Sequence, residues 1–185
     1  MVGAAGLVGR QVGVAWARTA LAHSVGGSVR DACVQMSIDT GNRYSFGRRQ
    51  MEVAPGALTF IGPGSAFTRH SKPGRMLGMD VGEAALAVAV RACCPDAVFD
   101  WARYPQVLHP PRQQTRALAD AITDLVSALH GQRPPIPLAQ CESRLISVLV
   151  DMLLPSSTPI PTGGVAAHRP ADLAAWIGAH LGARV

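Results

Sequence analysis

RYSFGRRQMEVAPGALTFIGPGSAF, residues 43–67, is the stretch that decides the fold. Short runs of alternating apolar and polar residues are separated in it by turns at Gly47-Arg48-Arg49, Pro55-Gly56 and Gly62-Pro63-Gly64. Glycine reaches the positive φ that tight turns need, and proline presets the φ of a turn's first central residue. The stretch therefore predicts consecutive short β-strands joined by sharp corners.

Similar strand patterns lie on both sides of this stretch. Val12–Ala22 is apolar and branched, Gly26-Gly27 is predicted to turn the chain, and Cys33–Asp39 and Arg75–Val81 alternate. The two faces of the 33–39 segment carry Val34, Met36 and Ile38 against Cys33, Gln35 and Ser37. Several short strands at a spacing of roughly 8–12 residues favour an all-β sandwich or barrel for this part of the chain.

After Gly82 the pattern changes from strand to helix. Glu83–Ala92 is rich in alanine, Thr115–His130 carries one apolar stripe, and Leu138–Leu154 repeats apolar residues at heptad-like steps. Such stripes either contact another subunit or cover the β-domain and each other, and both interpretations stay open. The candidate dimerisation residues are Leu118, Ile122, Leu125, Leu129, Leu145, Val148 and Met152.

The positive charge is concentrated in the first part of the chain. Residues 1–112 contain 12 Lys+Arg and 7 Asp+Glu, whereas residues 113–185 contain 5 of each. A pI near 9.6 would suggest nucleic acid as a partner. However, no basic run is longer than Arg48-Arg49 and aromatic residues make up only 5%. This distribution favours arginines scattered over a solvated surface.

Several classes of protein are excluded by pattern. Apolar stretches are shorter than the roughly 18 residues that a membrane span needs, and the N-terminus lacks the basic residues of a signal peptide. The cysteines show neither a disulfide framework nor a CxxC pair. We therefore expect a reduced, cytoplasmic protein. The cysteines are Cys33, Cys93, Cys94 and Cys141.

Motifs of catalysis are not found in the sequence. There is no GxSxG elbow, no phosphate-binding glycine loop and no HExxH. Ser65 and Ser71 lie close to His70 in a predicted loop, but a base adjacent in sequence rarely points at its neighbour. Cys93-Cys94 is more typical of packing than of redox chemistry. The sequence predicts no enzyme, no catalytic residue, no cofactor and no metal site.

The C-terminal part combines a linker with one further helix. Pro155–Ala167 is rich in Pro, Ser, Thr and Gly, which is typical of a linker. Pro170–Leu181 follows with an apolar stripe and an early aspartate, which favour a helix of about three turns. A lone amphipathic helix cannot bury its own apolar face, so we expect it to belong to a further domain.

In their order, these segments resemble the AraC/XylS-type transcription regulators. Pro55-Gly56 is similar to a corner of their effector-binding cupin barrel, and the two striped helices are similar to the pair that follows it. Trp176-Ile177 and His180-Leu181 resemble the first helix of their DNA-binding domain. The implied fold class is α+β, a cupin-like β-barrel of jelly-roll type followed by a helical pair. The implied domains are 1–112 (effector-binding barrel with a short helix), 113–154 (dimerisation helix pair), 155–169 (linker) and 170–185 (first helix of an incomplete helix-turn-helix domain).

The chain departs from the wider cupin pattern in two respects. Metal-dependent cupins carry an HxH pair and a Glu, whereas Arg43–Glu52 contains no histidine and Phe67 stands near a later histidine position. We therefore expect no metal in the barrel. The helix-turn-helix units would follow residue 181, so this chain is expected to lack groove recognition and to contact DNA only through a missing C-terminal domain.

The resemblance implies a sensor and dimerisation unit of a transcription regulator that binds a small effector as a homodimer. An excess of basic residues near the barrel suggests an anionic effector, such as a carboxylate. Two alternatives stay open: a small cupin-type enzyme with an unusual site, and a truncated regulator that acts as an interaction module. The candidate effector-binding residues are Tyr44, Phe46, Met51, Phe60, Met79, Arg43 and Arg69.

Overall fold

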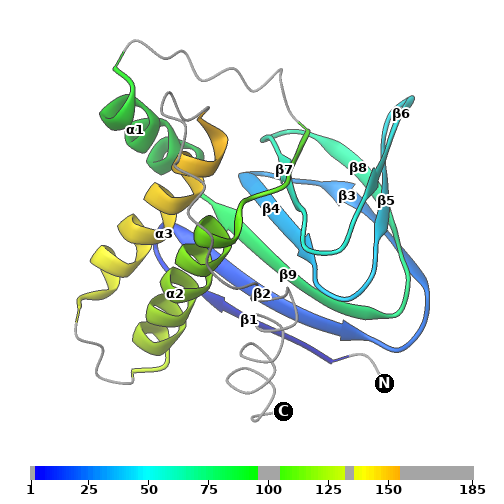
Figure 1. Ribbon diagram of the computed structural model, residues 1–185, viewed down its shortest axis with the longest axis horizontal. Helices are drawn as coiled ribbons and strands as arrows, with labels where there is room; N and C mark the ends of the chain where they lie inside the picture. Colours follow the sequence, from blue (N-terminus) through cyan, green and yellow to red (C-terminus); the bar gives the residue numbers. More distant parts are fainter. Residues whose placement is uncertain (1–2, 96–104, 132–135, 155–185) are drawn as a thin grey trace.

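The strands form two antiparallel sheets that face each other (Figure 1), in a computed structural model that describes residues 3–95, 105–131 and 136–154. The six-stranded sheet has the order β1 (Gly3–Val8), β2 (Val12–Thr19), β9 (Gly74–Val81), β4 (Ala32–Ser37), β7 (Leu58–Ile61) and β10 (Gln106–Leu108). The four-stranded sheet has the order β3 (His23–Ser28), β8 (Ala66–Ser71), β5 (Asn42–Phe46) and β6 (Arg49–Val53). The predicted linker 155–169 and helix 170–185 lie outside the described residues.

The connectivity of these strands is that of a jelly roll. The chain passes repeatedly between the two sheets, so β2 and β4 both pair with β9 while β3 and β5 both pair with β8. Strands β2 to β9 thus divide into two groups of four that lie face to face, as in the double-sheet jelly rolls that include the cupins. The predicted α+β class with a cupin-like barrel is confirmed.

The tight turns of the barrel lie at the glycines where the sequence predicted them. Gly47, Gly56 and Gly64 have φ of 57°, 79° and 73°, a region that side chains with a Cβ rarely adopt. Gly47 closes the β5–β6 hairpin, and the other two glycines lie in the turns on either side of β7. Local backbone chemistry in residues 43–67 therefore sets the ends of β5, β6 and β7.

Other parts of the sequence prediction were wrong or incomplete. Gly26-Gly27 does not turn the chain but lies inside β3, where β8 pairs with it. Ser71 and His70 lie in β8 and not in a loop. The edge strands β1 and β10 were not predicted from the sequence. The local pattern of residues does not show that β1 pairs with β2, and β10 has only 3 residues.

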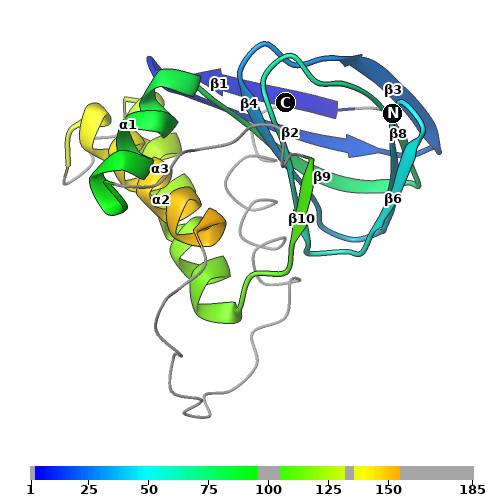
Figure 2. The ribbon, with the colours of Figure 1, turned by 90° about the horizontal axis from the view of Figure 1, so that it is seen from above.

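Three helices cover the face of the six-stranded sheet that points away from the smaller sheet (Figure 2). They are α1 (Glu83–Cys93), α2 (Arg112–Leu129) and α3 (Leu138–Leu153), close to the predicted bounds. Pro111 and Pro137 precede α2 and α3, where a missing backbone N–H costs no helical hydrogen bond. No helix in the described part of the chain is long and apolar enough to cross a membrane.

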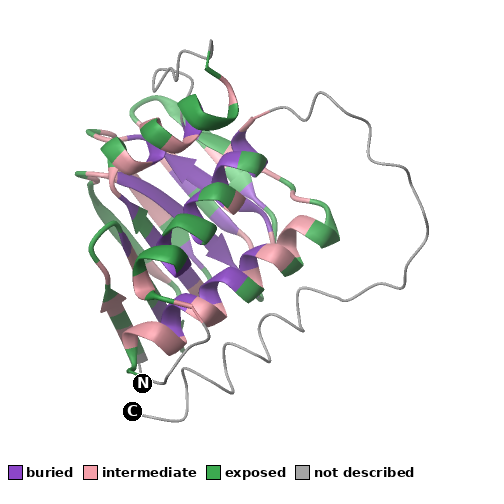
Figure 3. Ribbon diagram, turned by 90° about the vertical axis from the view of Figure 1, so that its left-hand side faces the viewer, coloured by how far each residue is buried: buried purple, intermediate pink, exposed green. Residues whose placement is uncertain are grey.

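The apolar stripes of α2 and α3 are buried inside this layer (Figure 3). Leu118, Ile122, Leu125 and Leu145 have no exposed surface, and Met152 is 9% exposed. The stripe's remaining members, Leu129 and Val148, are partly buried against the same core. The interpretation in which the helices cover the β-domain and each other is therefore the one observed. These side chains are not available to a second copy of the chain, and dimerisation itself stays a prediction.

Candidate binding site between the two sheets

The side chains between the sheets come from two rows of paired residues that face each other. In the six-stranded sheet, the strand register aligns Thr59, Gln35, Gly78 and Ala15. In the four-stranded sheet, the register aligns Met51, Tyr44, Arg69 and Val25. Hydrogen bonds that join the two rows show that they occupy the same level of the barrel.

Gln35 is the centre of a polar network that joins the sheets. Its Oε1 accepts hydrogen bonds from the Tyr44 hydroxyl at 2.9 Å and from Arg69 Nη1 at 2.8 Å. Arg69 Nε also donates to Ser71 Oγ at 3.0 Å. We call Gln35, Tyr44, Arg69 and Ser71 the Arg69 cluster. Polar groups in a protein interior are normally paired in this way, because an unpaired one is costly to bury.

Aromatic rings form a wall beside the Arg69 cluster. Tyr44 and Phe46 are stacked with ring centroids 6.0 Å apart and planes 8° from parallel. Phe67 lies 6.1 Å from each of them in a tilted arrangement. All three rings come from the inward face of the four-stranded sheet. Aromatic rings beside a few convergent polar groups are the kinds of side chain that line small-molecule sites.

The charge of Arg69 is not balanced by a carboxylate. Within the described ranges, Arg69 forms no ion pair, and its printed partners are the neutral Gln35 and Ser71. Arg43 differs, because it pairs at 2.5 Å with Glu52 and both side chains are exposed. Of the two basic candidates, Arg43 and Arg69, Arg69 is therefore the one whose side chain contacts residues between the sheets.

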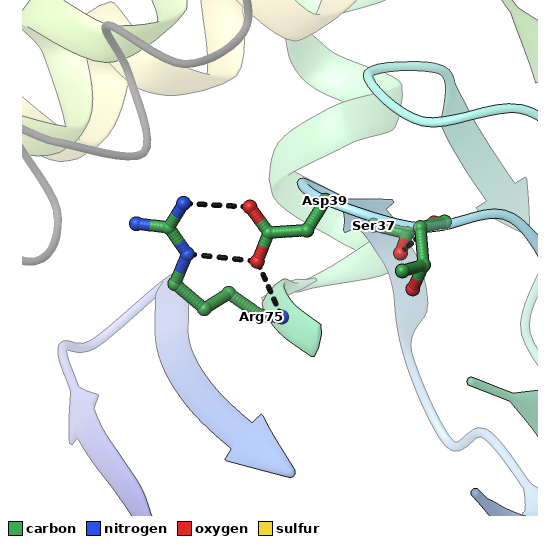
Figure 4. Close-up of polar contacts among 4 residues, drawn as sticks. Ser37, Asp39 and Arg75 are labelled. Atoms are coloured by element: carbon green, nitrogen blue, oxygen red, sulfur yellow. Dashed lines mark hydrogen bonds and ion pairs between the residues drawn. The ribbon is translucent and has the colours of Figure 1, made fainter. Parts of the chain in front are cut away.

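Arg75 is neutralised at one end of the barrel (Figure 4). Its Nε and Nη2 donate to the two carboxylate oxygens of Asp39 at 2.8 and 2.6 Å, and its backbone N–H donates to Oδ2 at 3.0 Å. These hydrogen bonds hold the pKa of the Asp39 carboxyl below its ordinary value of 3.8. In the same turn, Ser37 donates to the carbonyl of Thr40. The Arg75 pair therefore ties the start of β9 to the end of β4.

The ionisable groups beside Arg69 are held in their neutral forms. Burial, with a smaller contribution from Asp80, raises the pKa of the Cys33 thiol to about 12. Burial also raises the pKa of Tyr44, although the nearby Arg69 partly opposes that shift. Neither group can therefore offset the positive charge at neutral pH. Asp80 lies opposite Cys33 in the strand register but is exposed.

The structure brings together four of the predicted effector residues. Tyr44, Phe46, Met51 and Arg69 all lie on the inward face of the four-stranded sheet. Their role in binding stays a prediction.

Three other candidates do not lie between the sheets. Phe60 and Met79 lie in the core between the six-stranded sheet and the helices. Arg43 lies on the outer face of β5, one residue out of phase with Tyr44. The reason is that a shift of one residue sends a strand's side chain to the opposite face.

Sequence reasoning missed Gln35, Ser71 and Phe67. The signal for Gln35 was present, because the 33–39 segment alternates between an apolar face and one with Cys33, Gln35 and Ser37. Every described residue of β4 is buried or half-buried, so the polar face also looks into the protein. A buried polar face on a central strand is the pattern that could have identified the site.

Among the described residues, no group of three or more His, Cys, Asp or Glu could hold a metal ion. Arg43–Glu52 contains no histidine. The aromatic Phe67 stands near the position at which metal-dependent cupins carry a later histidine. The donors that converge in the barrel are an amide, a phenol, a hydroxyl and a guanidinium. Such a set can hold an oxygen-bearing organic molecule better than a transition metal.

Comparison with known proteins supports the fold. The chain is similar in structure to the AraC-like transcriptional activator CuxR, with a TM-score of 0.58 and 15% identity over 95% of this chain and 63% of that one. It is also similar to apo ToxT from Vibrio cholerae, with a TM-score of 0.58 and 5% identity over 77% of this chain and 54% of that one. This chain thus matches less than two thirds of the length of each of these two proteins.

A cupin superfamily protein from Desulfitobacterium hafniense matches 44% of the chain with 13% identity, a TM-score of 0.41 and coverage of 78% of that protein. The sequence matches no protein-family profile. It also matches no curated protein. The similarity to CuxR and ToxT establishes that this chain shares their fold, with a barrel followed by helices.

Proposed function

We propose that this chain is the effector-sensing and dimerisation portion of an AraC-type transcription regulator. The observation that supports this proposal most strongly is the structural match to an AraC-like activator over 95% of the chain. The interior of the barrel agrees with it, since the Arg69 cluster and three aromatic rings converge there. The effector would be a small, anionic molecule, because Arg69 has no carboxylate partner among the described residues.

The layered fold suggests how binding would reach the helices. β4 carries Gln35 on its inward face, while Val34 and Met36 on its other face pack in the helix-covered core. An effector that contacts Gln35 of the Arg69 cluster therefore touches β4, a strand that supports the helix layer. It shifts the regulator between two arrangements only if it binds one of them more tightly, since equal affinity shifts nothing.

Dimerisation and DNA contact complete the proposal. The buried stripes of α2 and α3 cannot form a dimer contact as they stand, so the contact would use the outward sides of the helix layer. On α3, the exposed residues of this outward side include Ser143, Arg144 and Ser147. A helix-turn-helix domain beginning near residues 170–185 would read DNA, and a dimer would gain effective concentration on two half-sites. We propose the cytoplasm as its location.

A reporter assay tests this function. Residues 1–185 are fused to a DNA-binding domain that needs a dimerisation partner, and transcription from its operator is measured with and without small-molecule extracts. We expect repression or activation that depends on both the fusion and the extract. Gln35→Leu, which removes the acceptor shared by Tyr44 and Arg69, is expected to abolish the response to extract. A monomeric fusion that responds to no extract would contradict the proposal.

We also propose that the chain is not an enzyme. The support is the match to regulators over most of the chain, compared with a partial match to a cupin superfamily protein. Metal analysis of the purified protein tests this point. Stoichiometric iron, zinc or manganese together with turnover of a substrate would favour the cupin-type enzyme instead.

A further inference from the structure

The turn between β1 and β2 is the place where the barrel meets two of the helices. The backbone N–H of Gln11 in this turn donates to Oε1 of Glu142 in α3 at 2.9 Å, and its carbonyl accepts the N–H of Gly82 at 2.9 Å. Gly82 is the N-cap residue of α1, and its own carbonyl accepts the N–H of Leu86. One residue at the edge of the barrel is therefore bonded to the start of α1 and to a side chain of α3. We call Gln11, Gly82 and Glu142 the joint.

Glu142 is an acidic side chain in an apolar setting. It is 2% exposed, and among the described residues it is the one acidic or basic side chain that is buried. No Arg, Lys or His in the described ranges forms an ion pair with it. Its Oε1 accepts a second, longer hydrogen bond from the Val12 N–H, at 3.4 Å. Because a buried carboxylate without a cation depends on such hydrogen bonds, a shift of α3 that lengthens them raises the free energy of the contact.

Gly9 shows that the turn is shaped around this carboxylate. A Cβ at Gly9 would overlap Oε1 of Glu142 and would lie 3.0 Å from the carbonyl oxygen of Val12. The backbone itself does not demand glycine there, since Gly9 is not one of the described glycines with a positive φ. At Gly13, in β2 of the same hairpin, an added Cβ would meet no atom beyond its chain neighbours nearer than 3.8 Å. The carboxylate, and not the backbone conformation, therefore excludes a side chain at position 9.

The first strand of this hairpin has few other attachments. Leu7 of β1 packs against the core, whereas Gly6 is exposed and Val8 is 84% exposed. β1 is also an edge strand, which pairs with β2 alone among the described strands. By contrast, Val12 at the start of β2 is buried and paired with β9. Opening of the turn can therefore loosen β1 while β2 stays in the sheet.

We propose that the joint is a latch that sets the position of α3 against the barrel. In the latched state, which is the one observed, Glu142 holds the turn and Gln11 holds the residue that begins α1. When α3 moves away from the sheet edge, Oε1 releases the N–H groups of Gln11 and Val12, the turn becomes solvated, and the contact to Gly82 weakens with it. Any ligand or partner that binds one of these two states more tightly shifts the balance between them. The latch is a local device that does not depend on what the barrel binds.

Amide hydrogen exchange of the full chain tests the latch. Glu142→Leu keeps a side chain of similar size and removes the acceptor. We expect the exchange rates of the Gln11, Val12 and Gly82 amides to rise about 10- to 100-fold, and to exceed any rise in β4 and β9 by about 10-fold. Glu142→Gln retains an acceptor oxygen, so the rise at these three amides should be smaller.

Two glycine variants test the same contact from the side of the turn. Gly9→Ala pushes a methyl group into Oε1 of Glu142 and should raise exchange at the same three amides by a similar factor. Gly13→Ala is the matched control, because its Cβ has room, and it should change these rates less than about 2-fold. In Glu142→Ala, where the carboxylate is gone, adding Gly9→Ala should produce no further rise.

Circular dichroism verifies that each variant is folded. The latch is overturned if the joint amides of Glu142→Leu exchange like those of the wild type. It is also overturned if their rates rise by the same factor as those of β4 and β9, since the turn then opens only with the whole chain. A rise at Gln11 and Val12 without one at Gly82 would overturn the connection to α1. Equal effects of Gly9→Ala and Gly13→Ala would show that the carboxylate does not shape the turn.

Discussion

At the residue scale, a buried carboxylate joins the helices to the barrel. Glu142 of α3 is 2% exposed, and its Oε1 accepts hydrogen bonds from the backbone N–H groups of Gln11 and Val12 at 2.9 and 3.4 Å. Gly9 lies so close that a Cβ there would overlap this oxygen. The turn between β1 and β2 is therefore shaped around a side chain of α3, which links the barrel's edge to the helix layer.

Removing this carboxylate should destabilise the protein. Glu142→Ala leaves the Gln11 and Val12 N–H groups without their acceptor, and we expect a loss of about 2–3 kcal/mol in the free energy of unfolding. Glu142→Gln keeps an acceptor oxygen but loses the charge, so its cost should be smaller. Urea denaturation at neutral pH measures both. Equal stability of the alanine variant and the wild type would show that these hydrogen bonds contribute nothing.

A second residue-scale prediction concerns Asp39 and pH. Because Arg75 lowers the pKa of Asp39 in the folded state, the pair stabilises the fold above the ordinary value of 3.8. This contribution is lost as the pH falls through the lower folded value. Since both side chains are partly exposed, we expect Asp39→Asn to cost about 1 kcal/mol or less at pH 7. The difference should shrink in urea titrations at pH values below 3.8.

The exposed pair of Arg43 and Glu52 is the control for this measurement. Their side chains are 58% and 71% exposed, so solvent screens the attraction. Glu52→Gln should leave the urea midpoint unchanged at both pH values. A loss equal to that of Asp39→Asn would show that the Arg75 pair has no special role.

At the scale of elements, α2 and α3 contribute mainly to the hydrophobic core of the chain. They pack against each other and against the outer face of the six-stranded sheet, with the apolar side chains of both stripes in one core. On the solvent side, Arg144 of α3 pairs with Asp124 of α2. The stripe spacing predicted a helix that packs along another helix, and the partner turned out to belong to the same chain.

Changes in these stripes should unfold the chain and not merely separate subunits. Leu125 and Leu145 are fully buried, so Leu125→Ala should cost about 2–5 kcal/mol, and Leu145→Asp should prevent folding. Asp120→Ala, on the exposed side of α2, is the matched control and should be within about 0.5 kcal/mol of the wild type. Circular dichroism with sedimentation distinguishes the outcomes: a folded, soluble monomer for Leu145→Asp would restore the stripe as a subunit contact.

At the scale of the whole molecule, one sheet lies between the candidate binding site and the helices. Inward residues of β4 and β9 line the space between the sheets, while their outward residues support the helices. Interiors are close-packed, so a displacement of these strands is transmitted and not absorbed. This arrangement gives the proposed sensor a physical route from ligand to helix layer.

Hydrogen exchange tests this route. A bound carboxylate should slow amide exchange in β4 and β9 and also in α3, which no ligand touches directly, because the ligand stabilises the folded state to which they all belong. With the same carboxylate present, Arg69→Met should show the exchange rates of the ligand-free wild type. Slowing confined to β5 and β8 would mean that the helices are not coupled to the site.

Part of the fold and of the site was predictable from sequence. The striped helices and the corners at Gly47, Gly56 and Gly64 follow from local chemistry. Tyr44 and Arg69 were predicted as candidate effector residues and lie together, whereas the candidate Phe60 lies in the helix-side core and Gln35 was not predicted. The sequence could not separate these positions because β4 and β7 are buried on both faces, so hydrophobicity does not tell which face looks inward.

The sequence by itself determined the order of short strands, their glycine corners and the amphipathic helices, because backbone conformation and side-chain periodicity are properties of neighbouring residues. Only the tertiary structure decided that Gln35 meets Tyr44 and Arg69, that Glu142 caps the turn before β2, and that the helix stripes face the sheet. These contacts join residues from 9 to 131 positions apart. Which partners meet over such separations depends on how the sheets pair and pack, and no local pattern encodes that choice.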